Sequence, residues 1–132
     1  MTLFLLLILG IHAELVREPQ VQTLMRDLLS GTRAGFEHRE EAAFIVRSAS
    51  GNFYAIEWPS NGALDSARWE GPFPAGTVAI AHTHPTHLPM PSNIDINVAR
   101  GTHVPVYVVT PETITRTDGG EPVVVAKWSA AS

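Results

Sequence analysis

The segment from Thr77 to Asp95 constrains this chain more than any other part of the sequence. It opens with a short apolar run that predicts a strand over residues 77–82, and it continues with two histidines, His82 and His84, separated by one residue. Side chains two residues apart on a strand lie on the same face. The strand should therefore direct both imidazoles to one point, and Pro85 should then end it.

A short helix is expected soon after this strand. Residues 92–100 have the composition of a helix, and Gly101 is expected to end it. Ser92 and Asp95 have the spacing of a capping box, with Ser92 as the N-cap. The first turn of this helix should therefore bring the Asp95 carboxylate near the two histidines.

Two imidazoles and one carboxylate are a ligand set that suits zinc. Three protein ligands leave the fourth tetrahedral position open, as in catalytic rather than structural zinc sites. Zinc in such a site lowers the pKa of its water to about 7. The His82–His84 pair alone is a weak signal, and Ser92 and Asp95 as an isolated pair are explained by helix capping. Only the combined pattern favours a metal site.

The remaining pattern predicts one α+β domain with a mixed sheet flanked by helices. Apolar residues from Val21 fall at helical spacing, with Gly31 as the expected C-cap. Two β-rich runs around a Ser-Gly-Asn turn predict a hairpin over residues 42–58, and a long loop should follow over 59–76. Further strands are expected over residues 104–109, 113–117 and 122–128.

Composition excludes several kinds of site and partner. The chain has 132 residues, no cysteine, a net charge of −4 and a single lysine, Lys127. Without cysteine there is no disulfide, iron–sulfur cluster or Cys-type zinc site. Without a basic cluster, nucleic acid is not expected as a partner.

The N-terminus predicts a cleaved export signal. An apolar run begins at Leu3 and continues to the small residue Ala13. The run is shorter than the roughly 20 residues of a transmembrane helix and fits the core of a signal peptide, so no stable membrane span is expected. Residues 1–13 would then be the signal and 14–132 the domain, in a periplasmic or secreted protein. A buried first strand or an overextended start, in a cytoplasmic protein, is the open alternative, because no basic residue precedes the run.

The whole string resembles the JAMM motif of the MPN (Mov34/JAB) zinc metallopeptidases, in their compact prokaryotic form. That motif is H-[ST]-H-P, six residues, then S-x-x-D, and every defined position is filled from His82 to Asp95. The resemblance extends over residues 19–128, although only the fourteen-residue string is diagnostic. It implies an α/β/α layered, MPN/JAB-like fold, related to the architecture of cytidine deaminases. It also implies one Zn²⁺ per chain, held by His82, His84 and Asp95.

The family also requires a glutamate at the start of a strand after the first helix. Glu41 is the best match, Glu40 the second and Glu37 the third. Ala43 and Phe44 stand where many members have a glycine soon after the glutamate, which leaves its register open. By the resemblance, Glu41 accepts a proton from the attacking water and returns it to the leaving amine. Ser92 donates a hydrogen bond to the oxyanion.

The resemblance implies a peptidase or isopeptidase that hydrolyses a bond in a protein or peptide substrate, such as the C-terminal tail of a ubiquitin-like protein. A non-catalytic MPN-type binding or scaffold module is the alternative. A nucleobase deaminase is excluded, since its signature requires cysteines. His87 lies between the ligands in sequence and is a further candidate for the cleft.

Overall fold

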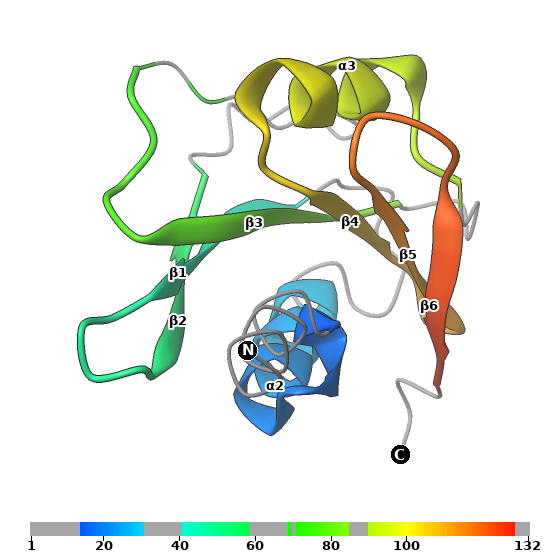
Figure 1. Ribbon diagram of the computed structural model, residues 1–132. Helices are drawn as coiled ribbons and strands as arrows, with labels where there is room; N and C mark the ends of the chain where they lie inside the picture. Colours follow the sequence, from blue (N-terminus) through cyan, green and yellow to red (C-terminus); the bar gives the residue numbers. More distant parts are fainter. Residues whose placement is uncertain (1–13, 31–40, 59–68, 70, 85–89, 129–132) are drawn as a thin grey trace, which may run out of the picture.

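The computed structural model describes residues 14–30, 41–58, 69, 71–84 and 90–128, which form a six-stranded sheet with a helix on each face (Figure 1). The predicted fold class is confirmed. In chain order the elements are η1 (Leu15–Arg17), α2 (Pro19–Ser30), β1 (Ala42–Arg47), β2 (Phe53–Glu57), β3 (Thr77–Thr83), α3 (Asn93–Thr102), β4 (Val106–Val109), β5 (Thr113–Thr117) and β6 (Val123–Lys127).

The sheet is mixed, with strand order β2-β1-β3-β4-β5-β6. Strands β3 and β4 are parallel, and the other neighbouring pairs are antiparallel. A parallel pair needs a crossover connection, and α3 supplies it by passing over one face of the sheet (Figure 1). The helix therefore begins beyond the carboxyl end of β3.

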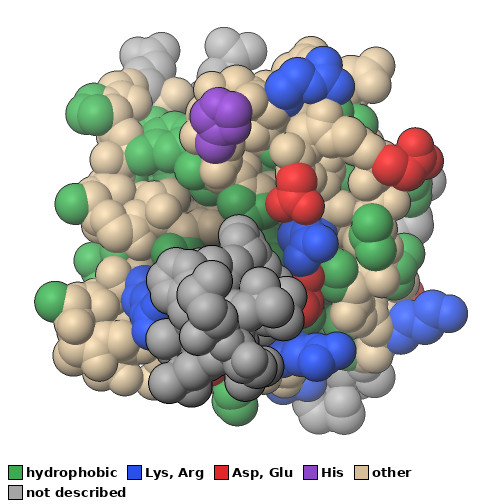
Figure 2. Space-filling model, viewed as in Figure 1, with side chains coloured by type: hydrophobic (Ala, Val, Ile, Leu, Met, Phe, Trp, Pro, Cys, Tyr) green, Lys and Arg blue, Asp and Glu red, His purple; other side chains and the backbone are tan. Residues whose placement is uncertain are grey.

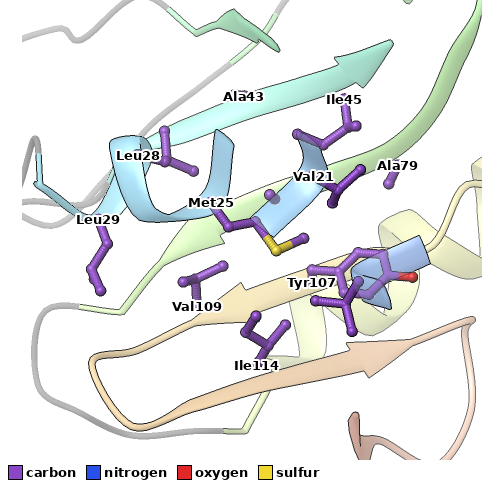
Figure 3. Close-up of a cluster of buried hydrophobic side chains, with 12 residues drawn as sticks. Val21, Met25, Leu28, Leu29, Ala43, Ile45, Ala79, Tyr107, Val109 and Ile114 are labelled. Atoms are coloured by element: carbon purple, nitrogen blue, oxygen red, sulfur yellow. The ribbon is translucent and has the colours of Figure 1, made fainter. Parts of the chain in front are cut away.

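Helix α2 covers the opposite face and makes the larger core. It begins at Pro19, whose fixed φ suits the first helical position. Its buried side chains recur at helical spacing and pack on alternate residues of the strands (Figure 3). The members of this core are Val16, Val21, Met25, Leu28, Leu29, Ala43, Ile45, Ala79, Ala81, Tyr107, Val109 and Ile114.

The α3 face of the sheet carries a smaller core. Its buried members are Phe44, Val46, Ile80, Ala99 and Val106, and aromatic side chains pack around them. Because side chains alternate along a strand, His82 shares this face with Ile80. The predicted site therefore lies on the α3 side of the sheet.

The turn between β5 and β6 fixes α3 against the sheet. Gly119 has a φ of 110°, and a Cβ atom added there would lie 2.7 Å from the Cα of Arg100. The Arg100 guanidinium donates to the Gly119 carbonyl from Nε at 3.0 Å and from Nη2 at 2.8 Å. Only glycine permits this close approach of turn and helix.

The prediction that Gly101 ends the second helix is wrong. The helix continues to Thr102, and His103 adopts the left-handed conformation of a C-cap, with a φ of 58°. Pro105 explains this end, because a proline cannot continue a helix and commonly follows the cap by one or two residues. The next strand consequently begins at Val106 rather than at 104.

Other expected elements lie within one or two residues of those observed, and the hairpin and the last two strands are confirmed. Residues 1–13, Gly31 and most of the expected 59–76 loop lie outside the described residues. None of the helices in the described ranges is long and apolar enough to cross a membrane.

Candidate metal centre

Strand β3 and helix α3 bring the three predicted ligands together. His82 lies near the end of β3, His84 directly follows that strand, and Asp95 occupies the third position of α3. The main-chain N–H of His84 donates to the Val109 carbonyl at 3.2 Å, so β4 still holds the chain beyond the end of β3. Each histidine is therefore fixed by the sheet rather than by a free loop.

The ligand atoms converge as the sequence predicts. His82, His84 and Asp95 each offer one ligand atom, and these atoms all lie within 4.8 Å of one another. Nε2 of His82 lies 3.0 Å from Oδ1 of Asp95, and Nε2 of His84 lies 3.8 Å from Oδ2. The two imidazole rings meet edge to face, with centroids 4.8 Å apart and planes at 75°.

Ser92 holds the Asp95 carboxylate in place, as the predicted capping box requires. The main-chain N–H of Ser92 donates to Oδ2 of Asp95 at 2.8 Å, and the hydroxyl donates to the same oxygen at 3.0 Å. The Ser92 hydroxyl oxygen accepts the Asp95 N–H at 3.2 Å. These bonds engage Oδ2 and leave Oδ1 to face His82, so helix capping and ligand placement are met by the same residues.

The electrostatic surroundings of Asp95 favour its charged form. Burial of the carboxyl raises its pKa, but the close approach and charge of His82, together with the hydrogen bonds from Ser92, outweigh burial and hold the pKa below its usual value. Asp95 is therefore an anion at neutral pH, which is the form that binds a metal.

Nε2 of His82 is a buried nitrogen without a satisfactory partner. It lies 3.0 Å from Asp95, but no hydrogen bond of acceptable angle reaches it from any described residue. A buried polar atom in this state needs an explanation. A cation between the two imidazoles and the carboxylate supplies one, because it binds the lone pair of a neutral imidazole. The residues present therefore fit a zinc ion.

Glu41 lies directly before β1, opposite the histidine motif. Its main-chain N–H donates to the Thr83 hydroxyl at 2.9 Å, and its carbonyl accepts the Thr83 N–H at 2.9 Å. Thr83 is fully buried. Sequence reasoning treated it only as a motif position, whereas the structure shows that its hydroxyl ties the start of β1 to the histidine strand.

The strand does not fix the direction of the Glu41 side chain. Ala42 pairs with His82 and is the first residue of the β1–β3 ladder. If the alternation of side chains along β1 continued to the residue before Ala42, the side chain of Glu41 would point to the α2 face, as that of Ala43 does. Because a side chain rather than a carbonyl accepts the Glu41 N–H, the regular ladder has ended at this point.

Three other candidates, Glu37, Glu40 and His87, lie outside the described residues. His103 is exposed at the end of α3, where it serves as the C-cap.

Comparison with known protein families gives a match over most of the chain. The model described as prokaryotic homologs of the JAB domain matches residues 25–126, a range that includes every site residue discussed above. The chain belongs to this JAB family. Comparisons with curated proteins and with solved structures give no match. The resemblance drawn from the histidine string is thus confirmed at the level of the family, and His82, His84 and Asp95 form a site in this JAB domain that could hold a metal.

Proposed function

We propose that this JAB-family protein is a zinc-dependent peptidase or isopeptidase. The observation that carries the proposal is the convergence of two imidazoles and one anionic carboxylate within 4.8 Å. A donor set of two nitrogens and one oxygen, without thiolate, suits zinc and leaves one position for water or substrate. When bound there, zinc supplies Lewis acidity toward the scissile carbonyl and lowers the pKa of a bound water.

Ser92 and Glu41 would supply the other catalytic groups. The Ser92 hydroxyl donates its one hydrogen to Oδ2 of Asp95, so it lies beside the ligand cluster. To stabilise a developing oxyanion, the hydroxyl would turn this hydrogen from Oδ2 to the substrate oxygen, while the main-chain N–H of Ser92 still holds Oδ2. Removing one such donor typically costs about 2.7–4 kcal/mol of transition-state stabilisation. Glu41 would accept the proton of the attacking water and deliver it to the leaving amine.

The proposed substrate is an extended peptide or protein tail, for which a ubiquitin-like C-terminus is one candidate. An extended tail can bind through main-chain hydrogen bonds. Basic side chains on the face in Figure 2 are scattered among acidic, polar and apolar ones. Such a surface suits a peptide better than a nucleic acid, whose backbone needs a continuous basic patch.

A zinc-binding scaffold without catalysis is the second candidate. It is favoured by one observation, the pleat of β1, which if continued would direct Glu41 away from His82. A peptidase needs a carboxylate at the metal side of the sheet. The two candidates therefore differ in what Glu41 does.

The test is hydrolysis of a library of fluorescence-quenched decapeptides and matched lysine-linked isopeptides by zinc-loaded protein. Glu41→Gln should lower the rate of hydrolysis about 10²–10⁴-fold, because the glutamine amide cannot accept and return the proton. The zinc content and the melting temperature should stay unchanged. Glu40→Gln is the matched control and should cleave at close to the wild-type rate.

The outcomes separate the two candidates. If Glu40→Gln is inactive and Glu41→Gln is active, Glu40 is the general base in place of Glu41, and the proposed peptidase function stands. No cleavage by zinc-loaded wild-type protein would favour the scaffold.

Export of the protein is a separate proposal, resting on the apolar run that begins at Leu3. N-terminal sequencing of protein from its native host should find that the run has been removed. An intact Met1 in a cytoplasmic fraction would contradict it.

A further inference from the structure

Four aromatic side chains gather on the same face of the sheet as the metal centre. The Phe44 ring lies 5.3 Å from the Trp58 ring, 4.9 Å from Trp69 and 4.8 Å from Phe73, measured between centroids. Phe44 belongs to the core beneath α3. Because Trp58 packs on Phe44, its indole lies on the α3 face as well.

Strand register places Trp58 level with His82. The Trp58 N–H donates to the Ala42 carbonyl at 2.8 Å, and Ala42 pairs with His82 across β1 and β3. The three residues thus form one row across the sheet, perpendicular to the strands. Neighbouring strands lie about 4.8 Å apart, so the Cα atoms of Trp58 and His82 are separated by roughly 10 Å.

Among the described residues, the indole nitrogen of Trp58 has no hydrogen-bond acceptor, in contrast with that of its neighbour Trp69. Nε1 of Trp69 donates to the Pro72 carbonyl at 3.3 Å. Nε1 of Trp58 is buried, and no acceptor in the described part of the chain reaches it. Leaving a buried donor unpaired lowers stability, so such a group calls for an explanation, and binding of a ligand is one.

A second unpaired nitrogen lies in the same row. Four buried side-chain atoms of the described residues lack a hydrogen bond, and two of them are Nε1 of Trp58 and Nε2 of His82. A metal ion held by His82, His84 and Asp95 would account for the histidine nitrogen. A peptide bound at the metal would bring carbonyl oxygens to this face of the sheet. One of these oxygens could accept a hydrogen bond from Nε1 of Trp58.

We propose that Trp58 is a substrate-binding residue whose Nε1–H donates to a main-chain carbonyl oxygen of the peptide held at the metal centre. The inference rests on the proposed peptidase function. An extended peptide advances about 3.3 Å per residue, so a peptide that follows this row would be level with the Cα of Trp58 about three residues from the metal centre. Main-chain recognition of this kind is independent of side-chain sequence.

The first experiment observes the indole N–H directly. Protein labelled with ¹⁵N at tryptophan gives three indole signals, since the chain has three tryptophans, and each is assigned with a Trp→Phe variant. The probe is the library peptide that wild-type protein cleaves fastest, added to zinc-loaded Glu41→Gln protein. The Trp58 signal should move downfield on binding, while those of Trp69 and Trp128 stay nearly in place.

The second experiment compares Trp58→Phe with Trp69→Phe. Both variants replace an indole of the same aromatic cluster by a phenyl ring, so both lose the Nε1–H group. Trp58→Phe should raise KM about three- to tenfold with little change in kcat, the factor that one neutral hydrogen bond to bound substrate contributes. Trp69→Phe should change KM less than twofold. In metal-free protein, Trp58→Phe should melt no lower than Trp69→Phe, because only the latter breaks a hydrogen bond.

The two proposals fail in different ways. If wild-type protein cleaves the peptide but the Trp58 signal does not move and the two variants share one KM, the inference is wrong and the peptidase stands. A lower melting temperature for Trp58→Phe than for Trp69→Phe, with unchanged KM, would make Trp58 a packing residue only. If zinc-loaded wild-type protein cleaves neither peptides nor isopeptides, the proposed function fails and the inference fails with it.

Discussion

Replacement of Ser92 by alanine tests whether one side chain supports both the helix and the metal. The change removes the hydrogen bond that Ser92 accepts from the Asp95 N–H and the bond that its hydroxyl donates to Oδ2. The main-chain bond from Ser92 to Oδ2, at 2.8 Å, remains. The carboxylate is therefore loosened rather than released.

The expected loss of stability follows from the N-cap. Substituting a serine N-cap by alanine typically costs about 1 kcal/mol. An unfolding entropy of about 2.1 cal/mol/K per residue over 132 residues converts this to a fall of about 4 °C in melting temperature. Because Ser92 also orients a ligand, zinc affinity should fall about 10- to 100-fold.

Calorimetry in the presence of a chelator measures the first effect, and competition with a fluorescent zinc indicator measures the second. Ser92→Thr keeps the hydroxyl and should retain most of both properties. The reasoning is refuted if Ser92→Ala melts within 1 °C of wild type and binds zinc equally well, or if Ser92→Thr is as impaired as Ser92→Ala.

Three further results are expected. Purified protein should contain about one zinc per chain by metal analysis, and a double His82→Ala, His84→Ala variant should contain none; retention of zinc by that variant would eliminate the site. Gly119→Ala should destabilise the fold by about 3 kcal/mol in denaturant unfolding, because it combines an unfavourable φ with a clash against α3, whereas Gly120→Ala, with open space around it, should be nearly neutral. Tyr107→Phe should cost about 1.5–3 kcal/mol in the same assay, because it removes a 2.6 Å hydrogen bond to a carboxylate; an unchanged midpoint would show that this bond contributes nothing.

The convergence of His82, His84 and Asp95 could be predicted from the sequence because its determinants are local. His82 and His84 are fixed by the two-residue period of a strand, and Asp95 by a capping box within one helical turn. Each rule acts over a few residues, so no tertiary information was needed to place the ligands on one side of the sheet.

Features that depend on distant contacts could not be predicted. Tyr107 donates to Glu14, which also pairs with Arg116, and nothing near these residues in sequence signals the network. The end of α3 was missed for another reason. Gly101 alone predicts an end at that residue, but glycine only permits a helix to end, whereas Pro105 shortly beyond prevents the helix from continuing.

The direction of Glu41 is the part of the site that strand periodicity leaves open. Periodicity applies inside a ladder, and Glu41 lies one residue outside it. The hydroxyl of Thr83 replaces the regular main-chain acceptor at that point, a substitution that a repeating pattern does not anticipate.

The parallel pairing of β3 and β4 has a consequence for how such a domain can diverge. All three candidate metal ligands belong to a single β-α-β unit that runs from Thr77 to Val109, whereas Glu41 lies directly before β1, outside that unit. Insertions in the β2–β3 connection would leave the spacing of the ligands untouched, so the chain can lengthen there to grip new partners without rebuilding the metal site. Under the proposed function, an exchange at the glutamate alone would abolish turnover and leave the ligand cluster and the fold intact. Zinc binding would then be a poor indicator of catalysis among domains with this architecture.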